Sequence, residues 1–303
     1  MQPSPHISVL LNEVLQTFAS IESGIIIDCT LGFGGHSQAL LEQNPNIKII
    51  GIDKDIDARR YSTRLLEKYG ERFECVAGGF GAQILGLIEK YGKKIKGVLA
   101  DIGVSSWQLD SPSKGFGFDS QMLDMRMDRD NPLTAEYILK HYSAMELSRV
   151  FSEYGELREA KKLASLIVED RKKLDFSSAK DFSHYLKKHF KNPKILPLVY
   201  QALRIEVNGE LEELKSLLDA ATKLQNATLC IITFHSLEDR LVKQAFRDYA
   251  QSCICPASAL RCTCGNHHQK GMLLAKRPII PSTEEVRANP RARSAKMRSF
   301  LFQ

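Results

Sequence analysis

The feature that most constrains the fold is a series of short apolar runs that alternate with segments of helical periodicity. Five runs have this character: GIIID (24–28), IKIIGID (47–53), FECVAG (73–78), KGVLADIG (96–103) and ATLCIITF (227–234). Strands that are apolar along their whole length must be covered on both faces, as in a parallel sheet with helices on each side. The sequence therefore predicts an α/β fold with a parallel sheet, whose ligand lies at the carboxyl ends of the strands.

Between the fourth and fifth runs the pattern becomes helical. The segments NPLTAEYILKHYSAMELSRVFSEYG, REAKKLASLIVEDRKKL and SSAKDFSHYLKKHF are amphipathic at helical spacing, and none alternates as a strand does. We expect residues 107–196 to form an all-helical insert, and residues 1–106 and 197–303 to form one discontinuous sheet domain. A helix over residues 198–224 would return the chain to the sheet.

The loop after the first run, DCTLGFGGHS, combines glycines with an acid. It partly matches the dinucleotide fingerprint G-x-G-x-x-G/A through Gly32, Gly34 and Gly35, but Ser37 stands at the last position. The carboxylate of Asp28 would repel a pyrophosphate, whereas it would attract the ammonium group or the sulfonium of S-adenosylmethionine. A nicotinamide-dependent oxidoreductase is therefore the less favoured alternative.

Three further residues stand where the same ligand would bind. Asp53 ends the second run, about 20 residues after the glycines, where an acid can accept both ribose hydroxyls of an adenosyl group. Phe80 follows the third run and could pack on the adenine, and Asp101 in the fourth run would lie near the reacting methyl group. Acids at successive strand ends favour a methyltransferase.

The distribution of charge indicates a polyanionic partner. The net charge is +6, and the segments 171–173, 187–194 and 287–298 hold several basic residues each and no acid. Such segments suit a nucleic acid, although a solvated protein surface is the alternative. No apolar run approaches the roughly 20 residues needed to cross a bilayer, so we expect a cytoplasmic protein with no membrane partner.

Taken in order, the motifs of the chain resemble those of the MraW/RsmH family. The resemblance covers nearly the whole chain and is carried by HISVLLNEVL, DCTLGFGGHS, GIDKD, DIGVSSWQLD, GFGF, LDMRMD, QALRIEVNGEL, FHSLEDRLVK and NPRARSAKMR. It implies a Rossmann-like, S-adenosylmethionine-dependent methyltransferase sheet with the helical insert. It also implies methylation of the N4 amine of a cytidine in 16S ribosomal RNA, at the decoding centre of the small ribosomal subunit.

The resemblance further implies where the donor and the substrate bind. The expected donor site consists of Asp28 beside the glycine turn together with the family positions Gly34, Gly35, His36, Asp53, Phe80, Asp101 and Gln108. The helical insert is implied to help recognise the RNA, as part of the assembled small subunit or as free RNA. A homodimer is compatible with the sequence, which does not determine the oligomeric state. A non-catalytic RNA-binding protein is a further alternative, but it would not need Asp53 and Asp101 at one edge.

The expected chemistry follows from the acceptor. Methylating carbon 5 of a pyrimidine needs a cysteine nucleophile, and no cysteine follows the fourth run in ADIGVSSWQL, so an exocyclic amine is favoured. Asp101 would position this amine by accepting its hydrogens. His235 in FHSLEDR could contact the flipped cytidine or its phosphate. A structural role is the alternative there, because Ser236 and Asp239 have the spacing of a capping box.

Four cysteines near the end of the chain form a pair of C-x-C motifs. They are Cys253, Cys255, Cys262 and Cys264. Four thiolates could bind zinc, although structural zinc sites more often use C-x2-C spacing. We expect a reduced, exposed loop without a metal, and keep a zinc site as the alternative.

Overall fold

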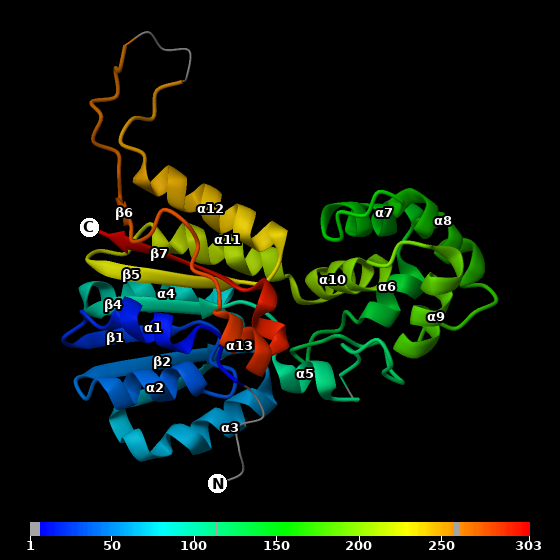
Figure 1. Ribbon diagram of the computed structural model, residues 1–303, viewed down its shortest axis with the longest axis horizontal. Helices are drawn as coiled ribbons and strands as arrows, with labels where there is room; N and C mark the ends of the chain where they lie inside the picture. The colour runs from blue at the N-terminus through cyan, green and yellow to red at the C-terminus, as the bar shows by residue number, and fades with distance from the viewer. Residues whose placement is uncertain (1–6, 113, 257–260) are drawn as a thin grey trace. The chain divides into compact units, whose positions relative to one another are not determined.

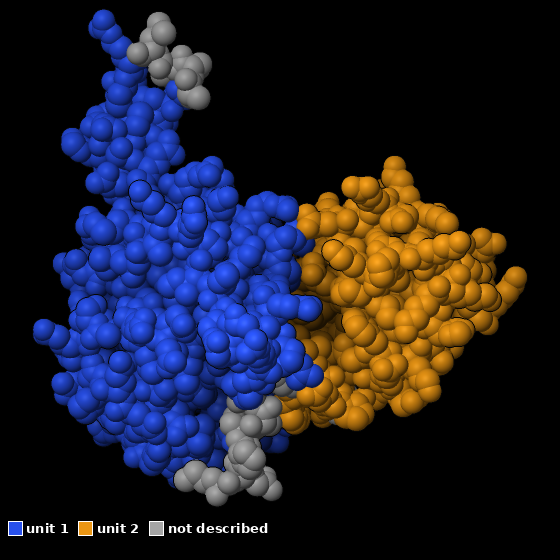
Figure 2. All heavy atoms as spheres, in the orientation of Figure 1, with its two compact units in different colours: residues 1–103, 212–303 blue, residues 104–211 orange. Residues whose placement is uncertain are grey.

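The structure is a computed structural model that describes residues 7–112, 114–256 and 261–303 (Figure 1). The chain divides into two compact units, which Figure 2 colours separately: unit 1 comprises residues 1–103 and 212–303, and unit 2 comprises residues 104–211. The insert expected from the sequence ends at residue 196. Helix α10 (Ile195–Asn208) nevertheless belongs to unit 2, because side chains such as Val199 and Leu203 are buried in the core of that unit.

Unit 1 is built on a seven-stranded sheet with the order β3-β2-β1-β4-β5-β7-β6. The first five strands pair in parallel, and β7 is antiparallel to both β5 and β6. The strands are β1 (Gly24–Asp28), β2 (Ile47–Asp53), β3 (Phe73–Ala77), β4 (Ile95–Asp101), β5 (Ala227–Thr233), β6 (Gly271–Leu273) and β7 (Lys296–Phe302). The five apolar runs thus become β1 to β5, which confirms the predicted Rossmann-like α/β fold, whereas β6 and β7 were not predicted from the sequence.

Helices cover both faces of this sheet. They are α1 (Leu11–Phe18), α2 (Gly35–Gln43), α3 (Ile56–Leu66), α4 (Phe80–Tyr91), α11 (Glu210–Ala221) and α12 (Ser236–Ala250). The unit also contains α13 (Thr283–Ala288) and short 3-10 turns at Glu67–Arg72, Gly92–Lys94 and Pro290–Ser294. Within β1, Ile25 and Ile27 point into a core shared with α4, α11 and α12, and Ile26 points into a second core shared with α1 and α2. Because successive side chains alternate across a strand, one apolar run supplies both cores.

All the regular secondary structure among the described residues of unit 2, 104–112 and 114–211, is helical. Its helices are α5 (Ser106–Asp110), α6 (Ala135–His141), α7 (Ala144–Glu153), α8 (Ala160–Asp170), α9 (Ala179–His189) and α10. They enclose a core of their own, which includes the fully buried side chains of Phe151, Phe182 and Leu203. Unit 2 therefore has the hydrophobic core of an independent domain.

The expected single helix over residues 198–224 is wrong. Helix α10 ends at Asn208 and α11 begins at Glu210, because Gly209 between them adopts a left-handed conformation with φ 61° and ψ 34°. The side chain of Asn208 accepts a hydrogen bond from the Met127 amide at 2.9 Å and donates one to the Met125 carbonyl at 2.8 Å. The motif IEVNGEL is thus a helix end that fixes a neighbouring loop. No helix among the described residues has the length and apolar character to span a membrane.

Candidate functional site

Three carboxyl groups lie at one edge of the sheet because they end parallel, hydrogen-bonded strands. Asp28 ends β1, Asp53 ends β2 and Asp101 ends β4, and β1 lies between the other two strands. The structure therefore brings the acids of the sequence analysis to the carboxyl edge, where doubly wound sheets bind their ligands.

Asp28 is tied to the glycine loop by side-chain hydrogen bonds. It is 2% exposed, and its carboxylate accepts a hydrogen bond from the Ser37 hydroxyl at 2.7 Å and another from the Thr30 amide at 3.2 Å. Burial raises the pKa of Asp28 to about 6, against the lowering effect of the Ser37 hydroxyl. Ser37, which interrupts the dinucleotide fingerprint, is therefore the hydrogen-bond donor that this buried acid requires.

Asp53 closes the glycine loop from the neighbouring strand. One of its oxygens accepts a hydrogen bond from the Gly32 amide at 2.8 Å, and the other accepts one from the Asp55 amide at 2.7 Å. Burial raises the pKa of Asp53 to about 6. Each carboxylate oxygen has a second lone pair, so both oxygens can still accept a hydrogen bond from a ligand hydroxyl.

Asp101 has an unsatisfied oxygen. Its backbone amide donates to the Thr30 hydroxyl at 2.7 Å, while its side-chain Oδ1 is buried and has no hydrogen-bond partner among the described residues. The other oxygen, Oδ2, lies 3.8 Å from Nδ1 of His36. A buried polar atom without a partner is uncommon and often marks a binding position.

His36 presents an acceptor nitrogen to Asp101. Its ring is 7% exposed and its Nε2 lies 3.0 Å from the Val9 carbonyl oxygen. Because a carbonyl can only accept, Nε2 must carry the proton, which leaves Nδ1 bare when the ring is neutral. Burial lowers the pKa of His36 to about 4, so the ring is neutral at physiological pH.

The whole edge disfavours additional negative charge. Burial, together with the charges of Asp28, Glu238 and Glu285, raises the pKa of Asp101 to about 8. Glu285 reaches this neighbourhood because its Oε1 accepts a hydrogen bond from the Leu10 amide at 2.7 Å. An anionic pyrophosphate would add to this repulsion, whereas a cation would relieve it.

Glu213 and Gly79 shape the loop after β3, although neither was predicted from the sequence as a site residue. Glu213 from α11 accepts a hydrogen bond from the Gly81 amide at 3.1 Å and lies 3.4 Å from the ammonium group of Lys54, which follows β2. A Cβ atom on a residue replacing Gly79 would collide with Oε1 of Glu213. Glycine at position 79 therefore lets Glu213 approach the backbone, and only the tertiary structure reveals this approach.

The other residues expected to bind the methyl donor also have structural roles in the protein. Phe80 begins α4 and is only 7% exposed within the hydrophobic core, and Gly34 precedes α2 with φ 79°. The Cβ of a residue replacing Gly35 would collide with the Ser8 hydroxyl. Gln108 lies in unit 2, where it forms a capping box with Ser105 at the start of α5. Their contacts with a donor remain predictions.

His235 caps α12, and the expected capping box is shifted by one residue. The predicted pair of Ser236 and Asp239 is wrong: His235 is the N-cap, and Glu238 accepts hydrogen bonds from the amides of Phe234 at 2.8 Å and His235 at 3.2 Å. Asp239 instead forms ion pairs with Arg298 at 2.7 Å and Lys296 at 3.2 Å. The chain enters the helix one residue earlier than expected, because Glu238 reaches back to the end of β5.

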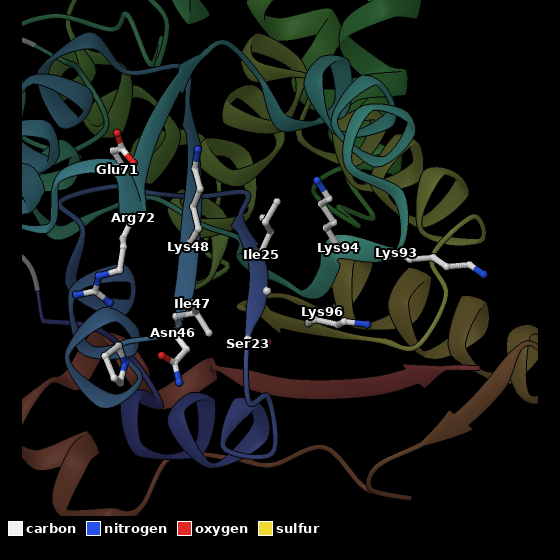
Figure 3. A pocket seen from close by; sticks show the side chains of 12 residues that line it. Ser23, Ile25, Asn46, Ile47, Lys48, Glu71, Arg72, Lys93, Lys94 and Lys96 are labelled. Atoms are coloured by element: carbon white, nitrogen blue, oxygen red, sulfur yellow. The ribbon is translucent and has the colours of Figure 1, made fainter.

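A cavity lies beside His235 on the surface of unit 1. It has a volume of about 320 Å³ and is lined in part by His235, Ser236, Ile280, Arg293 and Lys296. A larger cavity of about 620 Å³ lies at the opposite edge, where the strands begin, and Lys48, Arg72 and three further lysines line it (Figure 3). Because ligands of such sheets bind at the carboxyl ends, the larger cavity is not the donor site.

Some side chains of the basic segments are exposed to solvent, and others form hydrogen bonds or ion pairs within the protein. The two basic segments in unit 2, residues 171–173 and 187–194, contain six lysines, and all six are exposed: Lys172, Lys173, Lys187, Lys188, Lys191 and Lys194. By contrast, the Arg171 guanidinium donates to two backbone carbonyls, and Arg298 and Lys296 pair with Asp239. The four clustered cysteines lie between α12 and β6, away from the carboxyl edge.

The carboxyl edge suits the expected sulfonium donor. It offers a glycine loop whose backbone a ligand can approach, an acid at the end of β2 with free lone pairs, and the unpartnered Oδ1 of Asp101. Burial is the largest cause of the raised pKa of Asp101, and the charges of the surrounding acids add to it. The field of these acids favours a positive charge at this position. The arrangement can therefore hold an adenosyl group and a cationic sulfur side by side.

Comparison with known proteins supports the resemblance found in the sequence. The model of the MraW methylase family matches residues 3–302. A Helicobacter pylori (strain P12) protein named Ribosomal RNA small subunit methyltransferase H is 53% identical over 302 residues, which are 99% of this chain and 98% of that protein. A Wolinella succinogenes protein of the same name is 48% identical and covers 99% of each chain.

Solved structures show a more distant likeness. An rRNA methylase from Streptococcus thermophilus aligns over 98% of each chain with a TM-score of 0.41 and 10% sequence identity. A Streptococcus mutans protein described as a methyltransferase, solved in complex with SAH, aligns over 98% of this chain and 99% of that chain with a TM-score of 0.39 and 10% identity. At this level of similarity neither structure bears on what the chain does.

Proposed function

We propose a substrate and a catalytic role for this chain from the premise that it belongs to the MraW methylase family and is an S-adenosyl-L-methionine-dependent methyltransferase. Its substrate is small-subunit ribosomal RNA, as the names of its relatives indicate. We further propose that the acceptor is the N4 amine of a cytidine at the decoding centre of 16S RNA. The reaction takes place in the cytoplasm on the small ribosomal subunit.

The observation that supports this proposal best is the unpartnered carboxylate oxygen at the end of β4. Asp101 Oδ1 is buried and accepts no hydrogen bond from the described residues. An exocyclic amine has two N–H groups, and one of them would satisfy this oxygen. S-adenosylmethionine supplies an electrophilic methyl group attached to a cationic sulfur. Asp101 would hold the amine nitrogen in line with that methyl group.

Asp101 is also suited to receive the proton that the amine must lose. Its pKa of about 8 in the ligand-free protein lies near physiological pH, where proton transfer is most effective. A bound cation would favour the carboxylate form, which is the form that accepts a hydrogen. The bare Nδ1 of His36, 3.8 Å from Oδ2, offers a second acceptor nearby. The chain thus provides positioning and proton acceptance.

The buried cysteines argue against methylation of a ring carbon, which needs a thiolate nucleophile. Cys29 follows β1 at the carboxyl edge, but burial raises its thiol pKa well above the ordinary value. Cys230 lies inside β5, where burial raises its pKa to about 12. Neither thiol would be ionised at neutral pH. An amine acceptor needs no such nucleophile.

The exposed lysines of unit 2 support RNA recognition by that unit. Lysines 172, 173, 187, 188, 191 and 194 lie on or beside α8 and α9. Exposed lysines attract the phosphate backbone without regard to sequence. We therefore assign general RNA binding to unit 2 and selection of the nucleotide to the carboxyl edge of unit 1.

Mapping of modified nucleosides tests the proposal directly. Small-subunit RNA from cells lacking the gene should lose one N4-methylcytidine, and wild-type protein should restore it. The Asp101→Asn variant should fail to restore it, while the control Asp219→Asn, which changes an exposed carboxyl on α11, should restore it fully. Loss of a methyl group at carbon 5, or on another base, would refute the assignment of the acceptor.

A further inference from the structure

The segment that joins α12 to β6 has almost no hydrophobic core. Its described residues, 251–256 and 261–270, are mostly exposed, and the side chain of Ile254 is 58% exposed. Two backbone hydrogen bonds join its arms at the base, from Lys270 to the Tyr249 carbonyl at 2.7 Å and from His268 to the Ser252 carbonyl at 3.0 Å. Figure 1 shows the arms leaving the sheet unit beyond α12. Small elements without a core usually need a covalent or metal crosslink.

The four cysteines of this segment converge at the point where a crosslink would act. Their Sγ atoms all lie within 4.8 Å of one another, although Cys255 and Cys262 come from different arms. Three of the separations are 3.6 Å for Cys253–Cys262, 3.6 Å for Cys262–Cys264 and 3.7 Å for Cys264–Cys253. A tetrahedral zinc ion with Zn–S bonds of about 2.3 Å has sulfur–sulfur edges of about 3.8 Å. These three separations are close to the edges of one face of that tetrahedron.

Backbone amides support the sulfur atoms in a reciprocal pattern. Ile254, the middle residue of the first C-x-C motif, donates its amide to Cys264 Sγ at 3.4 Å. Thr263, the middle residue of the second motif, donates its amide to Cys255 Sγ at 3.3 Å. Each motif thus supports the second cysteine of the other. Amide hydrogen bonds to sulfur stabilise thiolates, which is the form that binds a metal.

We propose that Cys253, Cys255, Cys262 and Cys264 form a structural zinc site that holds the two arms together. Four thiolates in a tetrahedral arrangement select zinc or a soft ion of similar geometry, and four protein ligands leave no open position for catalysis. In a reducing compartment such a cluster is more consistent with a metal than with disulfides. This proposal differs from the expectation from the C-x-C spacing, which favoured a reduced loop without a metal. It does not depend on the methyltransferase activity.

Metal analysis of the full-length protein tests the proposal. Protein purified under reducing conditions, without a metal-affinity step, should contain about one zinc per chain. The double variant Cys262→Ser/Cys264→Ser should lose this zinc. A matched control, Cys75→Ser, changes a half-buried cysteine on β3 outside the cluster and should keep the zinc.

A second measurement uses only the wild-type chain, so that it stands if the double variant fails to fold. Cobalt(II) added to metal-free protein should give the intense visible bands and the thiolate-to-metal charge-transfer absorption of a tetrahedral tetrathiolate site, and zinc should abolish them. A featureless cobalt spectrum would overturn the proposal. The proposal would also be overturned if protein from cells grown with both metals contained iron and no zinc. Disulfides among the four cysteines, detected by mass spectrometry in the freshly purified protein, would overturn it as well.

Discussion

Replacing Asp101 with asparagine should change how the stability of the protein depends on pH. Burial and neighbouring acids raise the pKa of Asp101 from 3.8 to about 8, so the folded chain keeps a proton that the unfolded chain has already released between these values. The free energy of unfolding therefore falls by about 1.4 kcal/mol for each pH unit through this one group. Asparagine resembles the protonated acid in shape and charge, and removes that dependence.

The window from pH 6.5 to pH 8 isolates the effect. Asp28 and Asp53, with pKa values of about 6, and His36, with a pKa of about 4, have largely completed their titration below it. Over this window the wild type should lose about 1.5 kcal/mol relative to Asp101→Asn, because the folded Asp101 begins to ionise only near pH 8.

Urea denaturation of the ligand-free protein at pH 6.5, 7, 7.5 and 8 measures this difference. The wild type and the exposed control Asp219→Asn should show the same downward slope, and Asp101→Asn should be more stable than both by a margin that grows with pH. Parallel slopes for all three proteins would show that Asp101 is ionised throughout. In that case the role of Asp101 as a proton acceptor near neutral pH would have to be abandoned.

Three further changes test other parts of the structure. Ser37→Ala should destabilise the protein by about 1–3 kcal/mol. The loss should be larger at pH 7.5 than at pH 5, because the charged form of Asp28 then lacks a hydrogen-bond donor. Equal losses of unfolding free energy at the two pH values, measured by urea denaturation, would contradict this. The double variant Lys187→Glu/Lys188→Glu should weaken binding to ribosomal RNA about tenfold at low salt, and calorimetry should show an unchanged affinity for the methyl donor. An unchanged RNA affinity would contradict a role of unit 2 in RNA recognition. Gly209→Ala should cost about 1 kcal/mol from its left-handed backbone alone, since nothing lies within 4 Å of the added Cβ, and a loss above about 3 kcal/mol would point to a contact.

Local sequence patterns determined the five parallel strands of the sheet and the position of its ligand-binding edge. Ile25, Ile26 and Ile27 must face two cores, whatever the rest of the chain does, because side chains alternate along a strand. Once such strands are parallel, the acids that end them must share an edge. The sequence alone therefore predicted that Asp28, Asp53 and Asp101 lie together, and the order of its motifs indicated the family.

The tertiary structure decided the hydrogen-bond partners and the pKa values of those residues. Ser37 donates to Asp28 across the glycine loop, Glu213 reaches the Gly79 turn from a distant helix, and Glu238 displaces the expected cap of α12. The four sulfurs come together although their spacing argued against a metal. Periodicity is a property of neighbouring residues and can be read along the chain, whereas a pKa or a ligand set depends on desolvation and on charges brought near by remote segments.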